Sequence, residues 1–437
     1  MRRLAIAILM TVPLIAGGVF AQQKAGSDTA YEELNLFDEA FERIRQDAVD
    51  SVADAKLIGA AIAGMLSGLD PHSSFLDEAQ LKALQTPTND DVATLGLAVT
   101  IENGQLKVIS PQDGSPAARA GIRPGDVIFT IDKAPVYDLT LGEVEPKLRG
   151  PAGSEVQLTL RRGVEKPIDL TIKLEAHKLQ TVVGHVEAGN IGYLRIAGFD
   201  GGTQAALVGA MQDLRQKIGG KLIGFILDLR NNPGGAFDAA VAAADAFIDK
   251  GDIVVVKGRK PSSVRRISAT PGDLAKGLPL VALVNGGTAR EAELVAGALQ
   301  DNHRAVLLGT KTFGESAMES VIPLGHGGAI RLTTARFTTP SGREIQGKGL
   351  DPDLTVTPLK LAKLAQSEMR READLPGALK NPDQAAGKPP ADETATPAPT
   401  EVPSVATEDI GSASDEQLTQ AMDVLRGLSL VNRRAAG

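Results

Sequence analysis

The stretch VNGGTAREAELVAGALQ, residues 284–300, limits the fold more than any other part of the chain. It follows an apolar run and continues with apolar side chains at three- and four-residue spacing. A buried strand that passes through a Gly-Gly turn into a helix is typical of α/β folds. Such a turn places backbone N–H groups at a helix N-terminus, which suits a catalytic nucleophile. Yet the turn holds Thr288, Arg290 and Glu291, and neither serine nor cysteine.

Two further apolar runs support an α/β core. Residues 190–199 and 222–230 have the composition of buried strands, and the helix-like residues 203–220 lie between them, which predicts a βαβ unit. The sequence NNPGG, residues 231–235, then predicts a tight turn into a helix. Further strands are expected at residues 253–257, 278–284, 305–308 and 329–334.

Residues 92–174 change to short β-rich runs separated by glycine and aspartate. The Asn103-Gly104 pair between two alternating runs predicts a β-hairpin. Residues 116–120 predict a short helix that Gly121 closes. This pattern indicates a small, separate, β-rich domain.

The two ends of the chain have helical patterns. Residues 31–84 show helical periodicity, with a stop at Asp70 and Pro71. Near the C-terminus, Ser414 with Gln417 three residues later predicts the capped start of another helix. Its apolar face consists of Leu418, Met422 and Leu425. We expect this helix to dock on the body of the chain or on a second subunit.

The composition of the chain argues against several kinds of function. The formal net charge of -8 gives no electrostatic basis for binding nucleic acid. The chain has no cysteine, which excludes disulfides, thiolate metal sites and a cysteine nucleophile. Its five histidines have no HExxH spacing, so neither a metal nor another cofactor is expected.

The first 21 residues have the pattern of a secretory signal. Arg2 and Arg3 precede an apolar run, and small residues end at Ala21, where we expect cleavage. The protein is therefore expected to be exported, periplasmic or extracytoplasmic, and to be anchored if the segment is retained. No later segment of the sequence is long and apolar enough to span a bilayer.

Seven features occur in one order: the signal pattern, GMLSGLDPHSSFLD, the β-rich domain, GFILDLRNNPGG, LVNGGTAREAELVAGALQD, GTKTFGES and TTPSGREIQGKGLDPD. Together they resemble the C-terminal processing (tail-specific) peptidase family over residues 31–358. The resemblance implies a multidomain α/β plus β fold with an N-terminal helical segment, a PDZ-like domain, a crotonase-like α/β peptidase core, a disordered linker and a C-terminal helix. In that family a PDZ loop receives the carboxylate of a peptide C-terminus. The corresponding residues here are Gly96, Leu97, Ala98 and Val99.

Family members are serine endopeptidases with a Ser-Lys dyad, a supporting glutamine and an oxyanion hole of backbone N–H groups. When the family motifs are laid on this chain, the serine position is Arg290, the lysine position Glu315 and the glutamine position Glu319. The resemblance implies oxyanion-hole donors at Gly234, Gly235 and Glu291.

An arginine cation has no usable lone pair, so Arg290 cannot attack a carbonyl carbon. We predict instead an ion pair between Arg290 and Glu315 that Glu319 can share. A shifted dyad is the alternative, and the groups near enough to form one are Thr288, Ser316 and Lys311.

Three functions are therefore considered. The first is an inactive pseudopeptidase that binds protein or peptide C-termini or partner subunits, such as an active peptidase paralogue or an adaptor. The second is an active serine- or threonine-type endopeptidase with a noncanonical nucleophile, and the third is a structural envelope protein. A homodimer is expected. The expected domains are a signal peptide at 1–21, a helical domain at 28–85, a PDZ domain at 86–176, a peptidase-like core at 177–374, a Pro/Ala-rich linker at 375–412 and a terminal helix at 413–433.

Overall fold

The computed structural model describes residues 25–85, 92–102, 104–137, 139–163, 166–176, 180–325, 327–357, 410–412 and 415–435. The predicted signal peptide, Asn103, Ser414 and all but the last three residues of the predicted linker lie outside the described residues. The chain divides into two compact units, residues 1–62 and 63–437. Each unit is described by itself below.

The N-terminal region is helical, as predicted. Helix α1 (Ala25–Asp47) lies in the first unit, and α2 (Asp54–Ser67) runs from the first unit into the second. Strand β1 (Ser74–Leu76) and helix α3 (Glu78–Gln85) follow. The turn after α2 is fixed by Asp70, whose carboxylate accepts the backbone N–H groups of His72 and Ser73 at 2.9 and 2.7 Å. No described helix is both long and apolar enough to cross a membrane.

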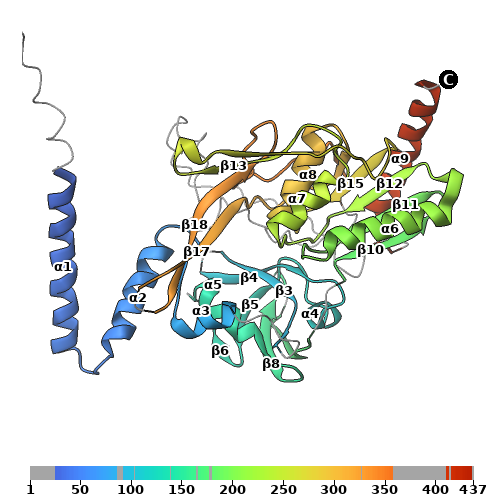
Figure 1. Cartoon of the computed structure of the whole chain (residues 1–437). Coiled ribbons are helices and arrows are strands. Elements are labelled where there is room, and N and C mark those ends of the chain that lie inside the picture. The colour runs from blue at the N-terminus through green and yellow to red at the C-terminus, as the bar shows by residue number, and fades with distance from the viewer. Residues whose placement is uncertain are drawn as a thin grey trace, which may run out of the picture. The chain divides into compact units, whose positions relative to one another are not determined.

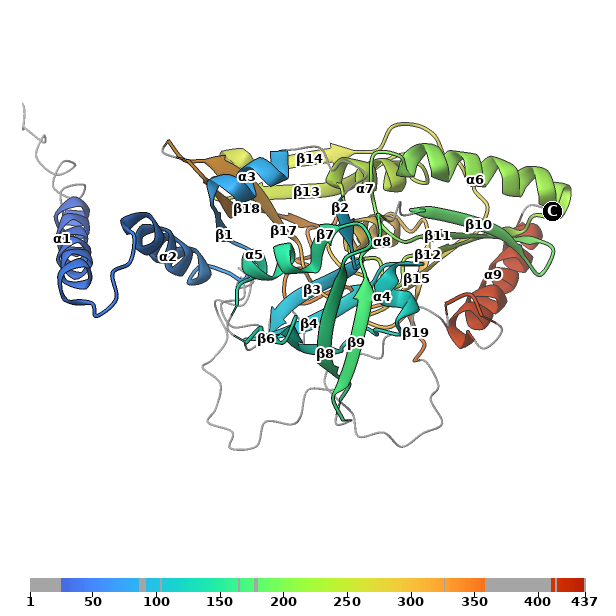
Figure 2. The same cartoon turned by 90° about the horizontal axis from the view of Figure 1, so that it is seen from below.

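An antiparallel sheet with its own apolar core forms the β-rich domain (Figure 2). Its strands, in spatial order, are β3 (Leu97–Glu102), β4 (Gln105–Pro111), β5 (Val127–Ile131), β8 (Glu155–Arg161) and β9 (Ile168–Lys173). The other elements are β2 (Val92–Thr94), which pairs with β7 (Arg149–Pro151), β6 (Ala134–Pro135), α4 (Pro116–Arg119), α5 (Leu141–Val144) and η1 (Glu145–Leu148). Glu102 pairs with Gln105, so the predicted hairpin is confirmed. Gly121 follows α4 with a φ of 77°, as a helix-closing glycine should.

A second sheet of six strands forms the centre of the α/β core (Figure 1). In spatial order they are β10 (Val182–Glu187), β11 (Ile191–Ile196), β12 (Gly224–Asp228), β15 (Leu280–Val284), β16 (Val306–Gly309) and β19 (Leu354–Thr355). All neighbours are parallel except β10 and β11, which confirms the predicted βαβ unit. One face packs against α6 (Thr203–Ile218), α7 (Phe237–Asp245) and α8 (Glu291–Asp301), with η2 (Gly219–Lys221) after α6.

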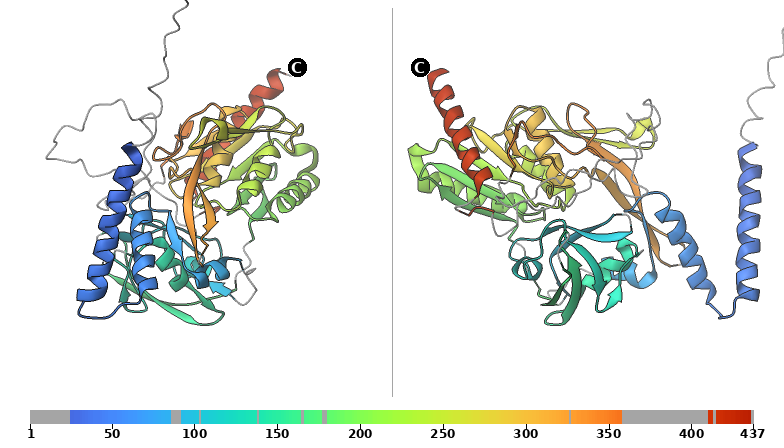
Figure 3. Two further views of the ribbon diagram at one scale, coloured as in Figure 1. Left: turned by 60° about the vertical axis from the view of Figure 1, so that its left-hand side comes forward. Right: turned by 180° about the vertical axis from the view of Figure 1, so that it is seen from behind.

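The opposite face of this sheet is covered by the terminal helix α9 (Glu416–Ala435) (Figure 3). Leu418, Ala421 and Leu425 pack against alternate residues of the central strands. Asp415 accepts the backbone N–H of Leu418 at 3.1 Å and so caps the helix. The helix thus docks on the body of its own chain.

A third sheet completes the core. Its order is β1, β18 (Ala329–Thr338), β13 (Asp252–Gly258) and β14 (Arg265–Ser268), with β17 (Ala317–Pro323) on β18 and η3 (Pro261–Ser263) before β14. The sequence predicts β13 and β18 but does not predict β17. The antiparallel pairing of β1 with β18 brings the loop that carries His72 to the core.

Candidate active site

Arg290 occupies the sharp turn between β15 and α8. Its backbone has φ 53° and ψ -121°, a conformation that is strained for a residue with a side chain. A strained strand-to-helix turn of this kind exposes the side chain of the residue at its apex. The turn therefore presents a guanidinium group at the place where a hydrolase presents its nucleophile.

Two carboxylates meet this guanidinium, and the predicted ion pair is confirmed. Arg290 Nε lies 2.9 Å from Glu315 Oε1, without the alignment of a hydrogen bond, and Nη2 donates to Glu319 Oε2 at 3.2 Å. The charges of Glu315 and then Glu319 raise the pKa of Arg290, so this group stays a cation. Burial raises the pKa of Glu319, and the charge of Arg290 opposes that shift. Arg290 and Glu315 thus neutralise each other, with the carboxylate buried and the guanidinium side chain partly exposed.

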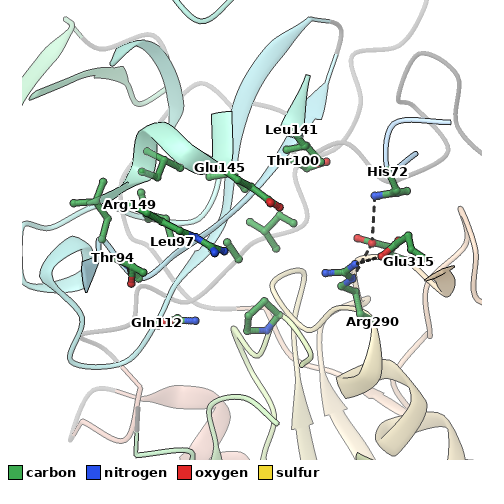
Figure 4. A pocket seen from close by; sticks show the side chains of 18 of the residues that line it. His72, Thr94, Leu97, Thr100, Gln112, Leu141, Glu145, Arg149, Arg290 and Glu315 are labelled. Atoms are coloured by element: carbon green, nitrogen blue, oxygen red, sulfur yellow. Dashed lines mark hydrogen bonds and ion pairs between the residues drawn. The ribbon is translucent and has the colours of Figure 1, made fainter. Parts of the chain in front are cut away.

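His72 is a further neighbour of Glu315, and no sequence motif predicts it at this site. Its Nδ1 lies 3.5 Å from Glu315 Oε1, and Figure 4 shows Glu315 between His72 and Arg290. His72, Glu315 and Glu319 each offer one metal-ligating atom, and these atoms lie within 4.8 Å of one another. The Arg290 guanidinium already contacts both carboxylates, so it supplies the positive charge that a metal ion would bring.

Glu293 connects the turn to the segment that carries Glu315. Its carboxyl oxygens accept the backbone N–H of Arg290 at 3.2 Å, those of Gly314 and Glu315 at 2.9 Å each, and the hydroxyl of Thr312. Burial raises the pKa of Glu293 to about 8, although these donors oppose the shift. The Glu293 side chain thus links the β15–α8 turn to the segment that carries Glu315.

The expected oxyanion-hole donors are partly engaged within the chain. The N–H of Gly234 donates to Asn232 Oδ1 at 2.9 Å. The N–H of Gly235 donates to Glu291 Oε2, also at 2.9 Å. The side chain of Glu291, at the first position of α8, therefore binds the turn predicted to bind substrate.

The three groups of the alternative dyad have other partners. Thr288 is fully buried, and its hydroxyl donates to the Leu229 carbonyl at 2.8 Å. Ser316 is also fully buried, and its hydroxyl lies 3.5 Å from Gln346 Oε1. Lys311 forms an ion pair with Asp351 at 2.9 Å. Thr288 and Ser316 are thus enclosed in the fold, and the Lys311 ammonium pairs with a carboxylate.

The predicted peptide-binding loop and the degenerate dyad line one cavity of about 280 Å³. Gly96, Leu97, Ala98 and Val99 all lie on its wall. Gly96 has a φ of 69°, and a Cβ atom there would collide with Ser115, so only glycine fits the loop. Figure 4 shows Leu97 and Thr94 on one side of the cavity and Arg290 with Glu315 on the other.

Comparison with known proteins identifies the family. A carboxy-terminal-processing protease of Bartonella bacilliformis is 46% identical over 328 residues, which cover 75% of each chain. This chain belongs to the carboxy-terminal processing protease family. A second member of the family, from Bacillus subtilis, is 33% identical over 362 residues, which cover 82% of this chain and 76% of the relative.

Family models match three regions in the expected order. Residues 16–80 match the N-terminal domain of the activating protease CtpB, residues 107–162 a PDZ domain, and residues 190–356 peptidase family S41. Among solved structures, the photosystem II D1 C-terminal processing protease aligns with a TM-score of 0.63 and 32% identity, over 74% of this chain and 92% of that one. These matches confirm the predicted family and fold class.

Proposed function

We propose that this member of the carboxy-terminal processing protease family binds protein C-termini without hydrolysing them. The observation that carries the proposal is the Arg290 guanidinium at the apex of the β15–α8 turn, paired with Glu315 and Glu319. A charged guanidinium cannot form an acyl-enzyme. Loss of a nucleophile or its base typically costs several orders of magnitude in rate.

The binding half of the proposal rests on the cavity beside this turn. The loop from Gly96 to Val99 lines this cavity, Gly96 has a φ of 69°, and Leu141 and Leu148 add apolar surface to the same cavity. An extended peptide can add to the edge of such a sheet and place its terminal side chain in the apolar part. The expected ligand is therefore an unstructured segment with an apolar C-terminus.

The cellular setting is part of the same proposal. We place the protein outside the cytoplasm, on the signal pattern of the first 21 residues. Its partners there would be protein C-termini, an active peptidase paralogue or an adaptor, and the chain itself would form a homodimer. To present substrates to an active peptidase, or to keep substrates away from it, the protein would need to bind them but not to cleave them.

A binding titration tests the proposal. Fluorescent peptides with an apolar last residue are compared with the same peptides amidated at the C-terminus. We expect the free acid to bind at least about tenfold more tightly, because amidation removes the charge that the loop recognises. Equal affinities would favour a structural protein with an unused groove.

Incubation with an unstructured polypeptide tests the second claim, that the protein does not hydrolyse what it binds. We expect no cleavage by the wild-type chain. Cleavage that disappears in Ser316→Ala or in Thr288→Ala, each shown to be folded by its thermal transition, would establish the alternative of an active endopeptidase.

A further inference from the structure

Two features converge at the start of α8, beyond the missing dyad. Gly235 donates its backbone N–H to Glu291 Oε2 at 2.9 Å. Helix α8 has 11 residues, so its positive end favours an anion at this point. The carboxylate therefore lies where the negatively charged oxygen of a tetrahedral intermediate would need to lie.

The surrounding shape fits this carboxylate closely. Gly234 has a φ of 100°, and a Cβ atom at that position would overlap Glu291 Oε2. The oxygen thus packs directly on the glycine backbone of the NNPGG turn.

The groups around Glu291 have opposing effects on its carboxylate. Burial raises the pKa of Glu291, whereas Arg290 and the N–H of Gly235 lower it. Arg290, the residue before it, already carries two acidic neighbours on its other side. The Glu291 carboxylate is held by the hydrogen bond from the Gly235 N–H.

We infer that the Glu291 side chain is an internal ligand of the oxyanion hole and keeps the carbonyl oxygen of a bound peptide out of it. This block is separate from the loss of the dyad. It deepens the proposed function and rests on it, since a site of this kind serves no turnover. The inference also means that the oxyanion hole can bind a carboxylate group as its ligand.

Amide NMR of the full-length chain tests the inference without any measure of hydrolysis. We expect Glu291→Ala to move the Gly235 amide resonance, and sodium acetate to shift it back saturably at constant ionic strength. Alanine is a strong helix former, so α8 should persist. In the wild-type chain acetate should leave the resonance unchanged, because the hole is filled.

Two variants serve as controls. Glu291→Gln keeps an acceptor oxygen, so acetate should have little effect on it. Glu416→Ala removes a first-turn glutamate from α9 instead, and the Gly235 resonance should stay at its wild-type position. An unchanged Gly235 resonance in Glu291→Ala, or no response of that variant to acetate, would overturn the inference. Peptide affinity at the Gly96 loop is measured separately, so the proposed function can fail while this result stands.

A second experiment asks whether the block is independent of the dyad. The triple variant Arg290→Ser, Glu315→Lys, Glu319→Gln is compared with the same variant that also carries Glu291→Ala, using an alkyl fluorophosphonate. In the labelling step the introduced serine oxygen bonds to phosphorus, fluoride leaves, and the introduced lysine accepts the proton. We expect the quadruple variant to be labelled about 100-fold faster, as for the gain of an oxyanion-hole donor. Equal rates, or no labelling of either, would contradict the block.

Discussion

At the level of single residues, Arg290 keeps the backbone conformation of a nucleophile turn while its side chain serves as a counter-ion. The sequence alone predicts this pair, since opposite charges at two aligned positions imply a contact. The side chain of Glu291 was not predicted, because a first-turn glutamate is also the ordinary residue at a helix start. His72 was missed for another reason. It reaches Glu315 only through the pairing of β1 with β18, which leaves no local signal.

Removal of the Arg290 charge should destabilise the fold. Arg290→Met leaves the carboxylates of Glu315 and Glu319 without their cation, and a loss of about 2 kcal/mol in the free energy of unfolding is expected, given that the arginine side chain is 37% exposed. Urea unfolding measures the change. Adding Glu315→Gln and Glu319→Gln should restore most of the loss. A single variant as stable as the wild-type chain would show that the pair contributes nothing.

Glu293 should make stability fall as the pH rises. Its pKa is raised from 4.5 to about 8 by burial, so between these values the folded chain holds a proton that the unfolded chain has lost. The free energy of unfolding should then decrease by up to about 1.4 kcal/mol per pH unit from roughly pH 5 to 8. Urea titrations at several pH values measure this slope. Glu293→Gln should flatten it, while Glu416→Gln should leave it as it is; equal slopes in all three chains would refute the assignment.

At the level of elements, short-range patterns predicted well and long-range pairings did not. The hairpin of β3 and β4 and the helix α4 depend on turn residues within a few positions, so the sequence predicts them. Strand β17 was missed because its residues are half-exposed and its stability comes from pairing with β18. The docking of α9 also depends on contacts between distant parts of the chain. Its apolar face predicts that the helix is buried, but not which surface of the protein covers it.

The docking of α9 can be tested on one helix with two leucines. Leu425 is fully buried against the central sheet, whereas Leu430 is 60% exposed. Leu425→Ala should lower the free energy of unfolding by about 3 kcal/mol, through lost burial and a cavity. Leu430→Ala should change it by less than about 0.5 kcal/mol. Thermal unfolding and hydrogen exchange in α9 measure both, and similar effects of the two changes would show that the helix is not docked here.

For the whole molecule, one series of ion pairs, buried except at the half-buried Asp113, joins the PDZ domain, the sheet and the terminal helix. Asp113, just after β4, is held by Arg195 of β11, which also contacts Asp228 of β12 at 3.5 Å. Asp228 binds Arg230, and Arg230 binds Asp415 at the start of α9. Burial alone would raise the pKa of Asp228, but the two arginines lower it below its ordinary value. Three regions that are distant in sequence thus share one set of ion pairs.

Asp113→Asn should loosen the PDZ domain from the core. The chain has no cysteine, so spin labels can be attached at Gln157→Cys and Gln216→Cys alone, both at exposed positions. We expect a broader distribution of label distances in Asp113→Asn, because the charge that Arg195 holds is lost. Asp213→Asn removes an exposed partner of Lys217 and should leave the distribution narrow. A distribution that stays narrow in both would show that other contacts fix the domain.

Arg230 also sets an order of events during synthesis. Its side chain has no exposure to solvent, and one of its two carboxylate partners, Asp415, lies 185 residues further along the chain. Asp415 must therefore leave the ribosome before both carboxylates can hold this cation. Until then Asp228 is the carboxylate that pairs with Arg230, and the start of α9 does not yet cover the guanidinium.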